Sequence, residues 1–234
     1  MQQTGNDLFE GWTTYEKVVA GDYMHQQVYF AGLLQEVQAS LPNQPLAILD
    51  LGCGDAQPIL PLLRRYDISA YTGVDDSDSA LVQAADRLSE FADSVTLVQS
   101  DMRDIHHLGQ FDLITASYSL HHLQLKEKQE MLGRCQKMLK PGGLLAVIDV
   151  FRQEQEVLSD YHQRWADYAE ACYVSLDQDE LDELISHVKG SDLPETQASY
   201  LEMAASAGLE LKQAQQVGDE KLNAMMIFSR STGE

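Results

Sequence analysis

The chain has 234 residues, 44% of them hydrophobic and 23% charged, which is typical of a single globular domain. Its 37 acidic side chains outnumber 16 Lys and Arg, and the net charge of -21 would repel nucleic acids and anionic membranes, so we expect neither as a partner. Three cysteines without metal-ligand spacing, no apolar run long enough to span a membrane and no signal-peptide pattern predict a cytoplasmic location.

In chain order, two helices are predicted before Leu41-Pro42, and apolar segments of strand length then alternate with helical patterns. The expected strands are 46–51, 70–74, 95–98, 111–116 and 144–150, followed by a hairpin of 209–217 and 223–230. Most of the first five are apolar on both faces, as in parallel sheets covered by helices. This predicts an α/β fold with a doubly wound, mostly parallel sheet of seven strands in one domain.

The region 152–208 contains more helix than one crossover between strands needs, and we interpret it as a helical lid inserted into the domain. Its second helix is expected to begin at Asp177, because Glu180 follows three residues later in the pattern of a capping box. The domain then divides into N-terminal helices (1–42), a core (46–150), the lid and the C-terminal strands (209–234).

The expected strands end in small or polar residues, at the sheet edge where open α/β proteins bind ligands. The first strand ends in Asp50-Leu51-Gly52-Cys53-Gly54, and its two glycines permit a sharp turn or close approach of another molecule. The other strand ends carry Asp75 and Asp76, Asp101 and Met102, and Ser117 and Tyr118, with His121 and His122 just beyond.

Taken together, these segments resemble class I S-adenosylmethionine-dependent methyltransferases over residues 46–150. The segment LDLGCGDA resembles the glycine-rich first motif, and YTGVDDSDSAL resembles the acidic end of the second strand. The segments VQSDMRDI, FDLITASYSLHHL and LKPGGLLAVIDV resemble the adenine-side segment and the fourth and fifth strands. One departure is Ala56, at a position where the family often has glycine.

The resemblance implies that the chain binds S-adenosylmethionine and releases S-adenosylhomocysteine. The implied cofactor-binding residues are Asp50, Gly52, Cys53, Gly54, Asp75, Asp76, Asp101, Met102, Ser117 and Tyr118. One carboxylate can accept both ribose hydroxyls, and Asp75 stands at the spacing expected for it, with Asp76 as the alternative. Asp101 and Met102 resemble the pair that contacts the adenine amine and ring, although strand-end acids are often only helix caps.

Two residues of the first motif have expected supporting roles. Asp50 is expected to organise the glycine loop through hydrogen bonds and to complement the cationic end of the cofactor. Cys53 has no neighbouring base in the sequence, and we interpret it as a small packing residue.

Two other functions compete with this interpretation. A nicotinamide-dependent oxidoreductase would continue the loop as GxGxxG, but this chain has Gln57 and then Pro58, which lacks a backbone donor for phosphate. A module that binds the cofactor without catalysis is the second alternative. A second pocket, suited to an acceptor, would distinguish an enzyme from such a module.

Methyl transfer is an in-line displacement that requires alignment and exclusion of water, and a base only when the acceptor carries a proton. His121 and His122 are the candidate bases, with backbone capping as the alternative, and the resemblance favours His122 as the inward member. Candidate substrate contacts are Tyr15, Tyr23, His25, Tyr161 and Trp165, although packing would explain most of them. Because acids do not cluster at the fourth and fifth strand ends, no metal is predicted. We expect methyl transfer to an unidentified small molecule.

Overall fold

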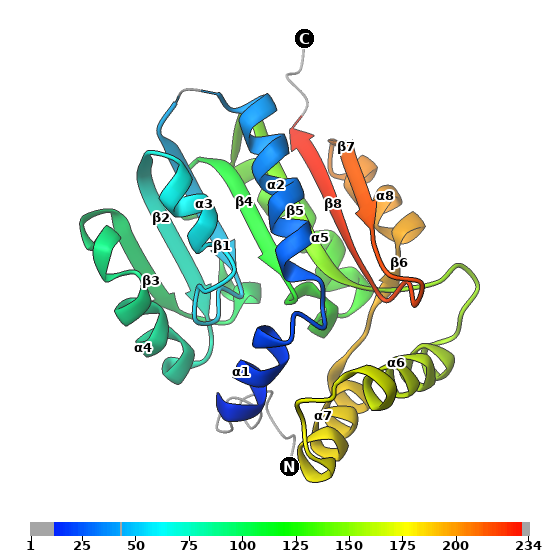
Figure 1. Ribbon diagram of the computed structural model, residues 1–234. Helices are drawn as coiled ribbons and strands as arrows, with labels where there is room; N and C mark the ends of the chain where they lie inside the picture. The colour runs from blue at the N-terminus through cyan, green and yellow to red at the C-terminus, as the bar shows by residue number, and fades with distance from the viewer. Residues whose placement is uncertain (1–11, 43, 231–234) are drawn as a thin grey trace.

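The computed structural model describes residues 12–42 and 44–230 as a central sheet with helices on both faces (Figure 1). The strands are β1 (Leu46–Leu51), β2 (Ile68–Asp75), β3 (Val95–Gln99), β4 (Phe111–Ser117), β5 (Leu139–Arg152), β6 (Glu195–Thr196), β7 (Leu209–Gln216) and β8 (Asn223–Arg230). Their order is β3-β2-β1-β4-β5-β8-β7, and β6 pairs with β5 beside this path.

Strands β1 to β5 pair in parallel, whereas β8 is antiparallel to both β5 and β7. The doubly wound, mostly parallel sheet and the late hairpin are therefore confirmed. The short β6 adds one strand to the seven predicted.

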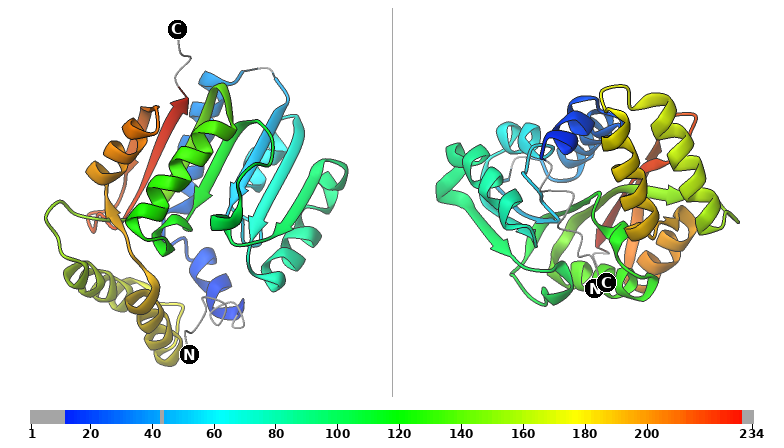
Figure 2. Two further views of the ribbon diagram at one scale, coloured as in Figure 1. Left: turned by 180° about the vertical axis from the view of Figure 1, so that it is seen from behind. Right: turned by 90° about the horizontal axis from the view of Figure 1, so that it is seen from below.

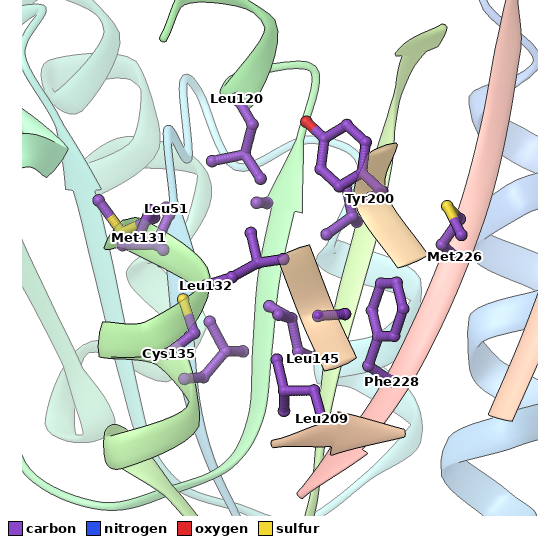
Figure 3. Packing of buried hydrophobic residues seen from close by; sticks show 14 of the residues in the cluster. Leu51, Leu120, Met131, Leu132, Cys135, Leu145, Tyr200, Leu209, Met226 and Phe228 are labelled. Carbon is purple, nitrogen blue, oxygen red and sulfur yellow. The ribbon is translucent and has the colours of Figure 1, made fainter. Parts of the chain in front are cut away.

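The helices are α1 (Trp12–Ala20), α2 (Gln26–Ser40), α3 (Leu60–Arg65), α4 (Asp78–Arg87), α5 (Leu125–Met138), α6 (Leu158–Cys172), α7 (Gln178–Ser191) and α8 (Gln197–Ser206). Short 3-10 turns are η2 (Ser89–Ser94), η3 (Met102–Asp104) and η4 (Leu120–His122). One face of the sheet packs against α2, α3 and α4. The opposite face packs against α5 and α8, and Figure 3 shows Met131, Leu132 and Cys135 of α5 near Tyr200 of α8 and Phe228 of β8.

The helix boundaries follow from local hydrogen bonds. Asp177 caps α7 by accepting from the backbone N–H of Glu180 at 3.0 Å, and the Glu180 carboxylate accepts the Asp177 N–H at 2.9 Å. The predicted capping box is confirmed. At α4, the Ser77 hydroxyl accepts from Ala80 N–H at 3.2 Å.

Helices α1, α6 and α7 lie beyond the carboxyl ends of the parallel strands, and we call these three helices the cover (Figures 1 and 2). Buried apolar side chains join the cover to the end of β5: Val18, Val150, Tyr161, Trp165, Leu181 and Val188. Helix α8 instead packs against α5 and β7, so α6 and α7 are the part of 152–208 that overhangs the sheet edge. None of the helices in the described part of the chain has the length and apolar character that crossing a bilayer requires.

Candidate functional site

The glycine loop after β1 turns through left-handed backbone conformations, with φ of 69° at Gly52 and 52° at Gly54. A Cβ at Gly52 would lie 2.4 Å from Cβ of Ser119, so close packing excludes a side chain there. At Gly54 the nearest atom to such a Cβ would be the Tyr15 hydroxyl, at 3.8 Å. The Gly54 side of the loop is thus open to a ligand, up to Tyr15 of α1.

Ala56 also adopts a left-handed conformation, with φ of 57°. This conformation costs a non-glycine residue about 1–2 kcal/mol. The departure from glycine therefore places backbone strain at the end of the loop, while the turn itself is retained.

Asp75 joins the end of β2 to the glycine loop. Its Oδ2 accepts the backbone N–H of Gly54 at 2.8 Å, and its Oδ1 accepts that of Ser77 at 3.0 Å. Burial raises the pKa of this carboxyl, while the two backbone donors oppose that shift. Each oxygen keeps acceptor capacity for a further donor, such as a ribose hydroxyl. The neighbouring Asp76 is exposed.

The adenine-side segment forms η3. Asp101 caps it by accepting the N–H of Arg103 at 2.7 Å, and its carboxylate also pairs with the Arg103 guanidinium at 2.5 Å. This pairing lowers the pKa of Asp101. Cε of Met102 lies 3.4 Å from the position of a Cβ on Gly52, so this side chain reaches the glycine loop.

Ser117 Oγ, at the end of β4, is buried and has no hydrogen-bond partner among the described residues. Three groups lie along these strand ends: the unpartnered Ser117 hydroxyl, the open side of the loop at Gly54 and the Asp75 carboxylate. Together they fit a nucleoside with hydroxyl groups and no phosphate. The residues present therefore fit the cofactor that the sequence predicts.

Asp50 and Cys53 lie beneath the loop. The Asp50 carboxylate accepts the Thr115 hydroxyl at 2.6 Å and the Tyr71 hydroxyl at 2.9 Å, which ties β1 to its neighbours β4 and β2. Burial raises the pKa of Asp50 to about 6 despite these donors. Cys53 is buried with Sγ 2.9 Å from the position of a Cβ on Gly73, which is close packing.

The sequence interpretation missed Asp55. This residue is 2% exposed and pairs with Arg87 of α4 at 2.8 Å, so it fastens α4 to the glycine loop. The signal available was an acid placed directly after Gly54.

Between the sheet edge and the cover is a cavity of about 150 Å³. Its lining residues are Thr14, Tyr15, Val18, Met24, Tyr118, His121, His122, Val150, Trp165, Tyr173, Leu184, His187, Val188 and Asp192. Tyr118 enters this wall with φ of 51°, and its hydroxyl donates to the carbonyl of Met24. We call this space the acceptor cavity, because it adjoins the predicted cofactor site through Tyr15 and Tyr118.

Of the five predicted substrate contacts, Tyr15 and Trp165 line the acceptor cavity, and the other three do not. Tyr23 stacks on Tyr173 and hydrogen-bonds Ser175, with the two hydroxyl oxygens 3.0 Å apart. His25 pairs with Glu220 at 2.8 Å. Tyr161 is fully buried in the cover.

The two candidate bases differ in burial. His121 is 7% exposed, whereas the side chain of His122 is 45% exposed, so the inward member is His121 and not His122 as predicted. Nδ1 of His121 lies 2.5 Å from Oδ1 of Asp149. Burial alone would lower the pKa of His121, but the charges of Asp149 and Asp192 outweigh it and raise the pKa to about 9. The partial burial of its ring against the cavity wall and the neighbouring imidazoles of His121 and His187 lower the pKa of His122.

His187 and Asp192 line the acceptor cavity, and the fully buried Asp149 lies behind His121; none of the three was predicted as a site residue. Asp149 interrupts the apolar run of β5, which was a visible signal. His187 and Asp192 belong to α7 and its end, and no local pattern indicates that they meet η4.

Comparison with known proteins agrees with this geometry. A family described as a methyltransferase domain matches residues 48–143. An uncharacterized methyltransferase of Bacillus licheniformis is 30% identical over 157 residues, which cover 65% of this chain and 70% of that protein. A trans-aconitate 2-methyltransferase of Deinococcus radiodurans is 30% identical over 114 residues, 48% of this chain. The chain spans only 42% of that enzyme's length.

The fold is shared with magnesium protoporphyrin IX methyltransferase of Synechocystis, a structure with bound S-adenosylmethionine. The TM-score is 0.63 at 14% identity, covering 93% of this chain and 84% of that one. At this identity the likeness concerns the fold alone. The sequence matches show that the chain belongs to the methyltransferase family, and its fold is the one found in S-adenosylmethionine-dependent methyltransferases.

Proposed function

We propose that the protein transfers a methyl group from S-adenosylmethionine to a small, largely apolar molecule bound in the acceptor cavity. When bound, S-adenosylmethionine supplies a methyl group on a positively charged sulfur. Asp75, the open face at Gly54 and the adenine-side pair Asp101 and Met102 are the residues we propose to hold it. The observation that carries the proposal is the acceptor cavity, which a module that only binds the cofactor does not require.

The cover has two roles in this proposal. Its apolar side chains, including Val188 and Trp165, exclude water and favour an acceptor with an apolar body. The volume of the acceptor cavity, about 150 Å³, favours a small molecule over a polymer. The polar wall of His121, His122 and Asp192 would orient the accepting atom at about 3–3.5 Å from the carbon to be transferred.

The cofactor assignment is tested by calorimetry with S-adenosylhomocysteine and with NADH. We expect saturable binding of the first and none of the second. Binding of NADH alone would instead favour the oxidoreductase interpretation, which the Gln57-Pro58 segment argues against.

The acceptor cavity is tested by filling it. In Val188→Phe the new ring would occupy the cavity, so transfer of labelled methyl groups to a small-molecule extract should be lost while S-adenosylhomocysteine still binds. Leu184→Phe, from the same wall, is the second variant if the first does not fold. Val174→Phe is the matched control, because Val174 is 86% exposed at the α6–α7 turn. Undiminished transfer by both folded cavity variants would refute the assignment of this cavity to the acceptor.

A further inference from the structure

We propose that His121, His122 and Asp192 bind one divalent transition-metal ion at the wall of the acceptor cavity. The proposal goes beyond methyl transfer and depends on the proposed function only for the metal's eventual role. Binding of the ion can be measured without any acceptor or cofactor.

The three ligand atoms face a common space. They all lie within 4.8 Å of one another. Nε2 of His121 lies 3.7 Å from Oδ1 of Asp192, and Nδ1 of His122 lies 3.8 Å from the same oxygen. These separations are too long for hydrogen bonds. Tetrahedral zinc with nitrogen and oxygen bonds of about 2.0–2.1 Å spaces its ligands about 3.4 Å apart, so small side-chain rotations would close the site.

His121 is already prepared as a ligand by a buried carboxylate. Asp149 is fully buried, and its Oδ1 lies 2.5 Å from Nδ1 of His121 while its Oδ2 accepts the His121 backbone N–H at 3.0 Å. With the Nδ1 proton shared with Asp149, Nε2 is the nitrogen that lies toward Asp192, and a metal ion bound there would displace the proton on Nε2. Metal-binding histidines almost always carry such a second partner, which fixes the ring orientation and the tautomer.

Asp192 is a buried carboxylate with few donors. It is 5% exposed, and among the described residues its carboxylate accepts one hydrogen bond, a long one of 3.4 Å from the Ser191 hydroxyl. Buried charges in proteins are normally paired, fully hydrogen-bonded or coordinated to metal. His121 and His122 face this carboxylate only at 3.7 and 3.8 Å, beyond hydrogen-bond distance, and a metal ion between Asp192 and the two imidazoles would bond to it directly.

Two imidazoles and one carboxylate favour transition metals such as zinc, iron, cobalt or nickel over magnesium or calcium, which prefer oxygen ligands. His187 also lines the cavity, with its ring edge-on to His122 at 6.0 Å between centroids, and could supply a further ligand. The remaining coordination positions would face the cavity, where an oxygen or nitrogen of the acceptor could bind. The sequence predicts no metal because acids do not cluster at the ends of the fourth and fifth strands, whereas these ligands come from η4 and the end of α7.

The test uses tag-free, full-length protein stripped with a chelator and titrated with Zn²⁺ in a calorimeter. A parallel titration with Co²⁺ follows its visible absorption, which reports coordination by the protein. We expect one ion per chain, and an affinity at least about tenfold weaker in His122→Asn and in Asp192→Asn. His106→Asn, at an exposed histidine outside the cluster, is the matched control and should bind as the wild type does.

His122→Asn changes a half-exposed side chain, so it should fold even if Asp192→Asn does not, and thermal unfolding checks both. If the wild type shows no saturable binding of Zn²⁺, the proposal is overturned, and His121, His122 and Asp192 form only an ion-pair cluster. Equal binding by the wild type and a folded His122→Asn would overturn it as well. Neither result bears on S-adenosylhomocysteine binding, so failure of the metal site and failure of the proposed function are distinguishable.

Discussion

The two halves of the candidate site are built differently. The cofactor half consists of strand ends and a glycine loop within residues 48–143, the segment that matches the methyltransferase family. Much of the acceptor half comes from the cover, where α1, α6 and α7 fall outside that segment and meet only in three dimensions. The residues proposed for the cofactor therefore lie in local motifs, whereas those proposed for the acceptor come together only by packing between distant segments.

If the halves are energetically separate, a large defect in the cover should leave the cofactor site intact. Trp165 is 7% exposed and packs edge-on against Tyr173 at 5.8 Å between centroids. Trp165→Ala should lower the free energy of unfolding by about 3 kcal/mol, because it removes a large buried side chain and leaves a cavity. Urea denaturation measures this loss, with Val174→Ala as the exposed control.

In the same Trp165→Ala protein, the affinity for S-adenosylhomocysteine should stay within about twofold of the wild type. A parallel loss of affinity at a temperature where the variant remains folded would show that the cover and the cofactor half act as one unit.

The cofactor half holds a destabilising charge. The pKa of Asp50 is about 6 in the folded protein, above its ordinary value of 3.8, so the folded state holds this proton more tightly than the unfolded state. The stability from protonated Asp50 is therefore present below about pH 4 and is lost as the pH rises through about 6. Asp50→Asn should leave stability nearly unchanged near pH 4 and raise it by about 3 kcal/mol at pH 7.

Urea denaturation of Asp50→Asn and wild type across this pH range measures the difference directly. The Thr115 and Tyr71 hydroxyls can rotate to suit an amide, so the variant keeps its hydrogen bonds. A difference that does not depend on pH would contradict a raised pKa at Asp50.

Substitution of Asp75 and of Asp76 tests which of the two acids binds the ribose of the cofactor. Asp75→Ala should weaken binding of S-adenosylhomocysteine at least about tenfold, because hydrogen bonds to a charged acceptor contribute about 1.5–3 kcal/mol each. Calorimetry measures the affinity, and Asp76→Ala is the neighbouring control, expected within about twofold of the wild type. A larger loss in Asp76→Ala would move the ribose contact to the alternative acid.

The smallest effect is expected at Arg103, whose ion pair with Asp101 is largely exposed. Exposed pairs contribute about 0–1 kcal/mol, so Arg103→Ala should lower stability by less than about 1 kcal/mol and alter cofactor affinity by less than about threefold. Asp101→Ala should cause the larger loss of affinity. If calorimetry shows a larger loss of cofactor affinity in Arg103→Ala than in Asp101→Ala, Arg103 contributes more to cofactor binding than Asp101 does.

The sequence predicted the sheet well because each buried parallel strand is an apolar run with polar or glycine ends. The predicted limits of β1 and β8 match the structure to the residue, whereas β5 begins five residues earlier, at Leu139, than the expected start. That extension depends on the pairing of Leu139 with Phe111 of β4, and residues 140–143 form an irregularity before the regular pairing resumes at Leu144, which local propensity does not indicate.

The acceptor wall was less predictable because its contacts join distant residues. His121 and Asp149 are separated by 28 positions, and Asp192 reaches the same place from the end of α7. The doublet His121-His122 was visible as a candidate, but which ring turns inward is set by Asp149, a residue on another element.

The most direct test of the account is a crystal structure of the protein with S-adenosylhomocysteine. We predict both ribose hydroxyls within hydrogen-bond distance of Asp75 and the sulfur open to the cavity lined by His121 and Trp165. A nucleoside bound without contact to Asp75, or a sulfur turned away from that cavity, would contradict it.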